Sequence, residues 1–207
     1  MKTPIIKRSV LREEIKSYLI DAIVKGTYKT GERLVETQIA RDLGISQAPV
    51  REAFRDLEQI GILKTVPYKG AYVNGYSTQD LRNAYDVRAE LEGLAIKIAV
   101  PQITDEQINE LENIYTQMQT VTDLKEQVQL DVQFHEYIVK ASHNSILERA
   151  WKSVSVAHWT YYGIYNFDEL DLIERHESII QAFRERDAQK ATDIIKKHFL
   201  ELKDQLE

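Results

Sequence analysis

Apolar residues recur every three or four positions between Ser9 and Gly26, a spacing that predicts one helix with a buried face. The same period predicts a short second helix at about residues 36–43, followed by a third helix that Ser46 caps and Gly61 ends. Two helices of this length joined by a Gly-containing turn are typical of a helix-turn-helix.

Two short segments with strand composition follow, at residues 62–66 and 71–73, around a turn that contains Gly70. A hairpin placed directly after a helix-turn-helix indicates the winged form of that motif. We therefore expect residues 1–75 to form a winged helix-turn-helix domain and residues 76–207 to form a second domain.

The second domain carries only helical periodicity, mostly with recognisable N-terminal caps. Thr104 and Ser145 begin sequences with capping-box spacing, and Asp168 and Asp187 are simple N-cap candidates. Six helices are expected, at about residues 77–99, 104–120, 122–142, 145–165, 168–186 and 187–205. The predicted fold is thus mainly α, with a winged helix-turn-helix followed by an antiparallel all-α bundle.

Charge divides along the same boundary. Residues 1–75 carry 13 Lys+Arg and 9 Asp+Glu, whereas residues 76–207 carry 14 and 24, so the two parts have net charges of +4 and −10. This asymmetry favours a DNA-binding domain joined to a domain that binds neither DNA nor an anionic membrane. Uneven use of surface ion pairs is the alternative explanation.

The absence of Cys excludes disulfides, thiolate metal sites and Cys nucleophiles. No segment has the roughly 18 consecutive apolar residues of a membrane span, and the first residues lack the apolar core of a signal peptide. We expect a soluble, cytoplasmic protein with no membrane partner.

The start of the third helix holds side chains suited to reading base edges. Gln47 can pair with adenine and Arg51 with guanine, whereas Ala48 and Pro49 offer only apolar contact, for example with a thymine methyl. Arg55 has two open interpretations, a phosphate contact or an ion pair with a neighbouring Glu on the same helix.

The run GERLVETQIARDLGISQAPVREAFRDLE, from Gly31 to Glu58, resembles the winged helix-turn-helix of the GntR family of bacterial transcription regulators. The second domain resembles the helical ligand-binding (FCD) domain of the FadR subgroup of that family, and six helices resemble its VanR-like branch. The segments that carry this second resemblance are VRAELEGLAIKIA (87–99), DVQFH (131–135), ERHESIIQAF (174–183), RDAQKA (186–191) and His198.

The resemblance implies a homodimer that binds a palindromic double-stranded DNA operator. It supports Gln47 and Arg51 as DNA contacts and adds Thr37, whose hydroxyl would meet phosphate, together with Lys69 and Gly70 at the tip of the wing. Gln47 replaces an Arg of the best-known members, so their operator sequence does not transfer to this chain.

Asp131 and His135 are one helical turn apart and project from the same face. Taken singly, an imidazole on such a face is more often a hydrogen-bonded core residue than a ligand. The resemblance implies that His176 and His198 join this pair to bind a divalent metal in the bundle core. Imidazole and carboxylate ligands suit Zn²⁺, Ni²⁺, Co²⁺ or Mn²⁺, and the sequence does not choose among them.

Arg88 matches a basic residue that lies near the effector pocket of such regulators, where its planar fork would bind a small carboxylate. The alternative is an ion pair with Glu92, one helical turn away. The aromatic run at residues 158–165 is expected to line the ligand cavity, to pack in the core or to form a dimer face.

These observations predict a ligand-responsive, sequence-specific transcriptional repressor rather than an enzyme. Two other hypotheses remain open from the sequence. One is a metal-dependent enzyme that uses the Asp and three His residues, although no separate general base occurs at motif spacing. The other is a regulator whose metal only stabilises the bundle.

Overall fold

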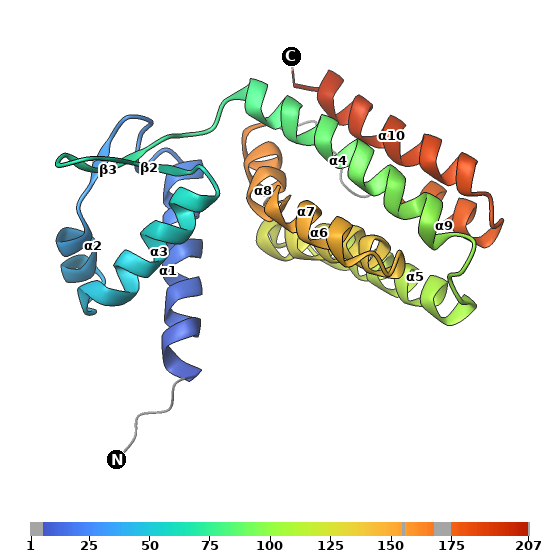
Figure 1. The fold of residues 1–207 in the computed structure, drawn as a ribbon, viewed down its shortest axis with the longest axis horizontal. Helices are drawn as coiled ribbons and strands as arrows, with labels where there is room; N and C mark the ends of the chain where they lie inside the picture. The colour runs from blue at the N-terminus through green and yellow to red at the C-terminus, as the bar shows by residue number, and fades with distance from the viewer. Residues whose placement is uncertain (1–5, 155, 168–174, 207) are drawn as a thin grey trace. The chain divides into compact units, whose positions relative to one another are not determined.

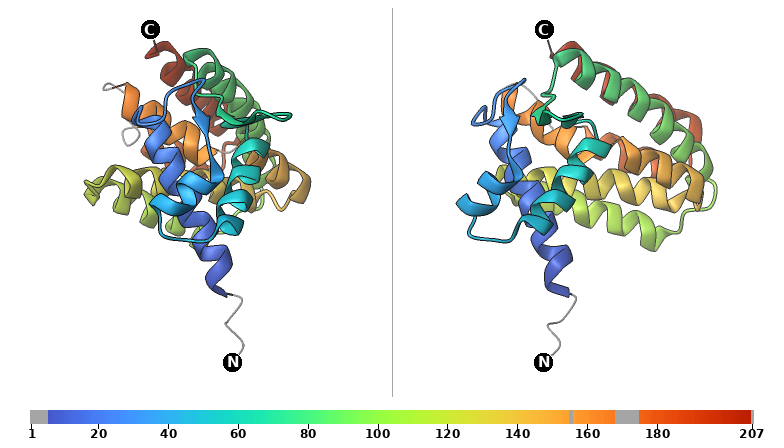
Figure 2. Two further views of the ribbon diagram at one scale, coloured as in Figure 1. Left: turned by 90° about the vertical axis from the view of Figure 1, so that its left-hand side faces the viewer. Right: turned by 60° about the vertical axis from the view of Figure 1, so that its left-hand side comes forward.

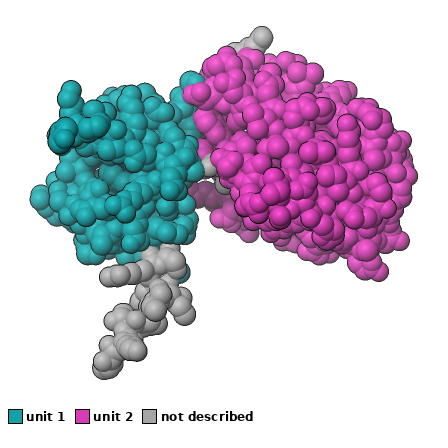
Figure 3. Space-filling view, viewed as in Figure 1, with its two compact units in different colours: residues 1–77 teal, residues 78–207 magenta. Residues whose placement is uncertain are grey.

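The computed structural model describes residues 6–154, 156–167 and 175–206, and the chain divides into two units. The first unit spans Met1–Ser77 and the second spans Thr78–Glu207 (Figure 3). Each unit has its own cluster of buried apolar side chains.

Three helices enclose the core of the first unit, namely α1 (Ile6–Val24), α2 (Glu36–Asp42) and α3 (Gln47–Gln59) (Figure 1). They bury one apolar stripe each, as the helical period predicts. The stripes meet in a shared cluster that includes Ile15, Leu19, Ile23, Ile39, Val50, Phe54 and Leu57. The three predicted helices are confirmed, although α1 begins three residues before Ser9.

A three-stranded antiparallel sheet completes this unit, with strand order β1-β3-β2. The hairpin of β2 (Leu63–Val66) and β3 (Gly70–Val73) confirms the predicted wing. Strand β1 (Arg33–Leu34) pairs with β3 and was not predicted. Two residues are too few to show an alternating pattern, so this strand exists only through its partner.

Seven helices make up the described part of the second unit, where six were expected. The predicted helix at 145–165 is two helices, because α7 ends at Ser153 and α8 begins at Val156. Residues 168–174 lie outside the described part, and with them the predicted cap Asp168. The helices are α4 (Thr78–Ala99), α5 (Asp105–Thr120), α6 (Leu124–Ala141), α7 (Ser145–Ser153), α8 (Val156–Asn166), α9 (His176–Arg184) and α10 (Ala188–Asp204).

Local caps explain where several of these helices begin. Thr104 and Gln107 form the predicted reciprocal capping box of α5, and Asp187 caps α10 through the backbone N–H of Lys190. The prediction for α7 was wrong by one residue, because the side chain of Asn144, rather than Ser145, accepts from the first turn. Asp123 caps α6 in the same way, because its side chain accepts a hydrogen bond from the backbone N–H of Glu126.

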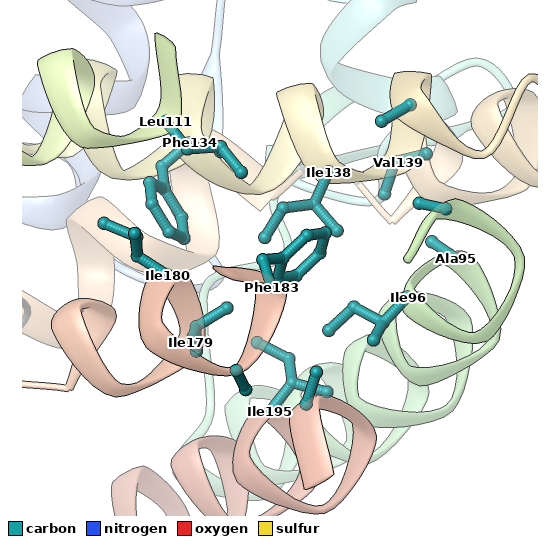
Figure 4. Packing of buried hydrophobic residues seen from close by; sticks show 14 of the residues in the cluster. Ala95, Ile96, Leu111, Phe134, Ile138, Val139, Ile179, Ile180, Phe183 and Ile195 are labelled. Carbon is teal, nitrogen blue, oxygen red and sulfur yellow. The ribbon is translucent and has the colours of Figure 1, made fainter. Parts of the chain in front are cut away.

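The core of the second unit joins helices that are far apart in the sequence. Helices α4 and α10 lie side by side along their lengths, as Figures 1 and 2 show. Apolar side chains from α4, α5, α6, α9 and α10 point toward one another, with Phe183 next to Ile138 (Figure 4). Among the residues that the structure describes, no helix combines the length and apolar character that crossing a membrane requires.

Two glycines of the first unit offer a matched test of backbone constraint. Gly75 (φ +79°) and Gly44 (φ +67°) both have left-handed backbones, but a Cβ at Gly75 would lie 2.1 Å from the Thr30 hydroxyl, whereas a Cβ at Gly44 would meet nothing within 4 Å. We expect Gly44→Ala to lower the free energy of unfolding by about 1 kcal/mol and Gly75→Ala to lower it by clearly more. Urea unfolding of both variants measures the difference, and equal losses would contradict the predicted clash.

Candidate functional site

Helix α3 is amphipathic, and this property determines which side chains it presents. Val50, Ala53, Phe54 and Leu57 are buried, so the opposite face is left to polar residues. Ser46 occupies the N-cap position with an extended backbone, as predicted, but its side chain makes no capping hydrogen bond. The backbone N–H groups in the first turn of α3 are therefore left without a side-chain cap from Ser46.

A hollow of about 430 Å³ lies between the start of α2, the exposed face of α3 and the wing. It brings together five of the eight residues predicted to contact DNA: Thr37, Gln47, Arg51, Arg55 and Gly70. Arg33 of β1 adds a further guanidinium to its lining. Two carboxylates, of Glu36 and Glu58, line it as well, so separate elements converge on one concave face in which guanidinium groups outnumber carboxylates by three to two, a combination suited to a nucleic acid backbone.

The remaining three predicted residues differ from one another. Ala48 and Lys69 are exposed, the latter beside the turn of the wing. Pro49 is buried, which leaves its ring little surface for the predicted apolar contact with DNA. Its ring follows the apolar stripe of α3, which the helical period places inward at this position.

Glu36, the first residue of α2, was not singled out from the sequence. Its Oε2 accepts hydrogen bonds from the Nε2 of Gln47 at 2.7 Å and from the Nε of Arg51 at 3.0 Å. The two predicted base-reading side chains therefore share one carboxylate. Among the described residues, no ion pair joins Arg55 to a Glu of its own helix, so its guanidinium remains available for phosphate.

Tyr68 is a second residue that the sequence interpretation did not assign. It is fully exposed in the turn between β2 and β3, and its backbone is left-handed (φ 63°), which is uncommon outside Gly, Asn and Asp. The hairpin pattern predicted a turn here but gave no signal for the side chain. An exposed aromatic ring at the wing tip adds apolar contact area beside Lys69 and Gly70.

In the second unit, three predicted metal ligands meet in the core. His135 of α6, His176 at the start of α9 and His198 of α10 are buried, and one nitrogen of each lies within 4.8 Å of the others. The Nε2 atoms of His135 and His176 are 3.3 Å apart. Nitrogen ligands of a tetrahedral zinc ion are separated by roughly this distance, given Zn–N bonds of about 2.0–2.1 Å.

Asp131 lies at the edge of this histidine cluster. Its Oδ1 is 3.5 Å from the Nε2 of His135 and 3.4 Å from the Nε2 of His176. Both carboxylate oxygens are buried without a hydrogen-bond partner among the described residues, as are the Nδ1 atoms of His176 and His198. Buried polar atoms normally have partners, so the unpartnered carboxylate of Asp131 beside three imidazoles fits a cation that would bind it.

Glu92 of α4 supports the cluster from the opposite side of His135. Its Oε2 is 2.5 Å from the Nδ1 of His135, and its Oε1 accepts from the indole Nε1 of Trp151 at 2.8 Å. A carboxylate on Nδ1 selects the tautomer that carries its proton there and leaves the Nε2 lone pair facing the cluster. The sequence showed Glu92 only as a possible partner of Arg88.

The ion pair between Arg88 and Glu92 is confirmed, with Arg88 Nε donating to Glu92 Oε1 at 3.0 Å. Arg88 is nevertheless 2% exposed, and it also donates from Nη1 to Thr160 Oγ1 at 3.3 Å. Its Nη2 is buried without an acceptor among the described residues, and its guanidinium lies 4.5 Å from the ring centroid of Phe199. The two interpretations of Arg88 are therefore compatible, since one edge is paired and another is open.

The protonation states follow from burial and from the neighbouring carboxylates. Burial lowers the pKa of His176, and burial together with the charge of His176 lowers the pKa of His198 well below its ordinary value. Burial also opposes the charge on His135, but Glu92 and Asp131 outweigh it and raise the pKa of His135 to about 9. Burial raises the pKa of Asp131, but His135 outweighs it and holds that pKa well below its usual range. The site thus contains an ionised carboxylate and two neutral imidazoles, the forms that bind metal ions.

The aromatic run at 158–165 lies on α8 and contributes mainly to packing. Thr160 and Tyr161 are buried, and Trp159 and Tyr162 pack against the core of the second unit. Through Thr160 the run also reaches the guanidinium of Arg88. Tyr165 is 41% exposed.

A winged helix-turn-helix joined to an all-α unit with a buried histidine cluster defines a class of two-domain DNA-binding regulators. Residues 11–73 match the family model described as bacterial regulatory proteins of the gntR family, and residues 83–201 match the FCD domain. The chain belongs to the GntR family and carries an FCD domain. This architecture is consistent with the FadR subgroup of the family. It is a transcription regulator and not an enzyme.

Relatives of similar length agree with this assignment. The chain is 29% identical to the HTH-type transcriptional regulator YdhC of Bacillus subtilis (strain 168), covering 86% of this chain and 82% of the relative. It is 28% identical to the probable D-xylose utilization operon transcriptional repressor of Paenarthrobacter nicotinovorans, covering 93% and 87%. Its fold is similar to that of McbR/YncC from E. coli, with a TM-score of 0.69 and 22% identity over 92% of this chain and 94% of the other.

The stability of the second unit depends on the buried Arg88–Glu92 pair. Glu92→Ala leaves the guanidinium buried without its carboxylate, and we expect the free energy of unfolding to fall by about 3–5 kcal/mol. Glu90→Ala is the matched control, because Glu90 lies on the same helix with its side chain 73% exposed in an ion pair with Lys196. The control should change stability by less than about 1 kcal/mol. Denaturant unfolding that gave similar losses for both variants would contradict this assignment.

Proposed function

We propose that the protein is a ligand-responsive transcriptional repressor whose helical domain binds a divalent metal and a small carboxylate effector. The observation that carries the proposal is the arrangement around Glu92. One buried carboxylate pairs both with Arg88, whose Nη2 is open, and with His135 of the histidine cluster. The proposed cation site and the proposed anion site would thus lie next to each other and share Glu92.

The DNA-binding part of the proposal assigns base contacts to Gln47 and Arg51 and backbone contacts to Thr37, Arg55 and Lys69, with Gly70 allowing a close approach of the wing. A homodimer would place two copies of α3 on a palindromic operator. Its support is the charged hollow between α2, α3 and the wing. Because phosphate contacts release counterions, affinity should fall steeply with salt.

The metal would be held by Asp131, His135, His176 and His198. Three buried imidazoles and one carboxylate suit Zn²⁺, Ni²⁺, Co²⁺ or Mn²⁺. When bound, the ion supplies positive charge that attracts a carboxylate. Because the pKa of His135 is about 9, metal binding at neutral pH requires the release of a proton from this imidazole. Glu92 keeps the ring oriented throughout.

The effector would bind through the open edge of Arg88. A carboxylate that pairs with Nη2 changes the charge balance of the guanidinium that Glu92 also contacts, so effector and metal affinities should be coupled. This linkage is reciprocal, and it can drive a switch only if the effector prefers one arrangement of the dimer.

Repression is proposed from two relatives, the probable D-xylose utilization operon repressor and the gluconate operon transcriptional repressor of Bacillus subtilis (strain 168), the latter 26% identical over 89% of this chain and 80% of the relative. A repressor acts where its operator is, so we propose a cytoplasmic location.

A second candidate function, suggested by the unpartnered atoms of Asp131, is a regulator whose metal only stabilises the bundle.

Arg51→Ala tests the assignment of the reading helix. We expect the loss of about 1–3 kcal/mol of binding free energy and relaxed preference at one base pair per half-site. Fluorescence anisotropy on a duplex selected by the wild-type protein from a random pool measures both effects. Arg41→Ala is the control, because Arg41 is exposed on α2 and hydrogen-bonds Gln38. An Arg51 variant with unchanged affinity and sequence preference would remove this residue from the reading set.

Metal and effector binding can be separated by thermal unfolding of the protein after chelation. Zn²⁺ added in excess should raise the midpoint for the wild type but not for His176→Ala. His143→Asn is the control, because His143 is a left-handed turn residue outside the cluster, and Asn tolerates that backbone. A carboxylate that stabilises only metal-loaded protein with an intact Arg88 supports the effector site. Complete unfolding on chelation, with no carboxylate response, would favour the purely structural metal.

A further inference from the structure

Glu36 places a negative charge at the head of α2, on a face where three guanidinium groups and one further carboxylate, that of Glu58, line the same hollow. It lines the hollow together with Arg33, Arg51 and Arg55, where a carboxylate opposes the approach of phosphates. A residue that served DNA affinity alone would not be acidic at this position. Its contacts therefore call for another explanation than general attraction to DNA.

The geometry points to Glu36 as a specificity-determining residue that positions Gln47 and Arg51 and penalises DNA lacking the matching bases. This inference rests on the proposed reading role of those two residues. One oxygen, Oε2, receives both side chains, which come from positions 11 and 15 residues further along the chain. The head of α2 thereby determines how the first two turns of α3 present their polar groups.

The contact with Glu36 leaves the terminal amino groups of Arg51 available for a base. Because its Nε donates to Glu36, the two terminal amino groups of the guanidinium remain available for the bidentate contact with guanine O6 and N7. The Arg51 side chain is 52% exposed, so these groups remain accessible to a ligand. A long, rotamer-rich side chain held in this way loses less entropy when it binds.

The contact also orients the amide of Gln47. A carboxylate only accepts hydrogen bonds, so the amide nitrogen must face Glu36 and the carbonyl oxygen must face away. This orientation leaves the oxygen and the second N–H for an adenine edge. The same carboxylate thus removes the ambiguity between the two amide orientations.

The negative charge of Glu36 supplies the penalty against DNA that lacks the matching bases. On a non-cognate duplex, Arg51 has no base to pair with, and the carboxylate opposes the phosphates without compensation. On a cognate duplex, the oriented guanidinium and amide recover that cost through base contacts. Affinity for random DNA is reduced in exchange for discrimination.

The test compares Glu36→Ala with the matched control Glu52→Ala in full-length protein. Glu52 is exposed on α3 next to Arg51, and its removal makes the same change in net charge without breaking either contact. Anisotropy is measured on the duplex selected by the wild type and on a scrambled duplex of equal composition. Both variants should bind the scrambled duplex more tightly than the wild type, whereas only Glu36→Ala should lose about tenfold or more of the specific-to-random affinity ratio.

Repeating the selection with each variant gives a positional readout that a general loss of stability would not produce. Glu36→Ala should lose preference at the base pairs that Arg51→Ala and Gln47→Ala lose. Glu36→Asp keeps the charge but shortens the reach, so its ratio should fall without any gain on scrambled DNA, and it serves if Glu36→Ala does not fold. A ratio within twofold of the Glu52→Ala control, or preference lost at other base pairs, overturns the proposal.

The outcomes also distinguish this inference from the proposed function. If Arg51→Ala loses part of the consensus but Glu36→Ala keeps all of it, the positioning role falls and the reading role stands. If Arg51→Ala keeps the whole consensus, the reading role falls and the role of Glu36 falls with it.

Discussion

The second unit depends on one buried carboxylate. Glu92 has no exposed surface, and its two oxygens receive donors from three helices through Arg88, His135 and Trp151. An ionised group in a dry interior is tolerated only with such partners, so the relative positions of α4, α6 and α7 must satisfy it. The same carboxylate connects Arg88 to one member of the histidine cluster.

The first unit uses an acidic residue in the same way but under different conditions. Glu36 also binds two basic or polar side chains of another helix, yet it lies at the surface, where water screens its charge. We therefore expect Glu92 to contribute strongly to folding, and we propose that Glu36 chiefly affects the orientation of Gln47 and Arg51. In both units the chemically important cation, Arg51 or Arg88, keeps part of its guanidinium free for a ligand.

The charge distribution explains why a carboxylate effector would need a buried cationic site. Residues 76–207 carry a net charge of −10, so long-range steering does not favour an anion. Attraction of the carboxylate must come from local groups in a region of low dielectric. In such a region a guanidinium or a metal ion interacts strongly with an anion. Arg88 and the histidine cluster meet this condition because both are buried.

The sequence alone determined most helices of both units, the wing and the candidate ligands, because these depend on spacing within one element. The stripe of α3 and the capping box at Thr104 are examples. Only the tertiary structure decided that the helix expected at 145–165 ends at Ser153. It alone also assigned Glu36 its two partners and Glu92 its contacts with His135 and Trp151. Those contacts join residues 11 to 59 positions apart, and no local periodicity records which helices will pack together.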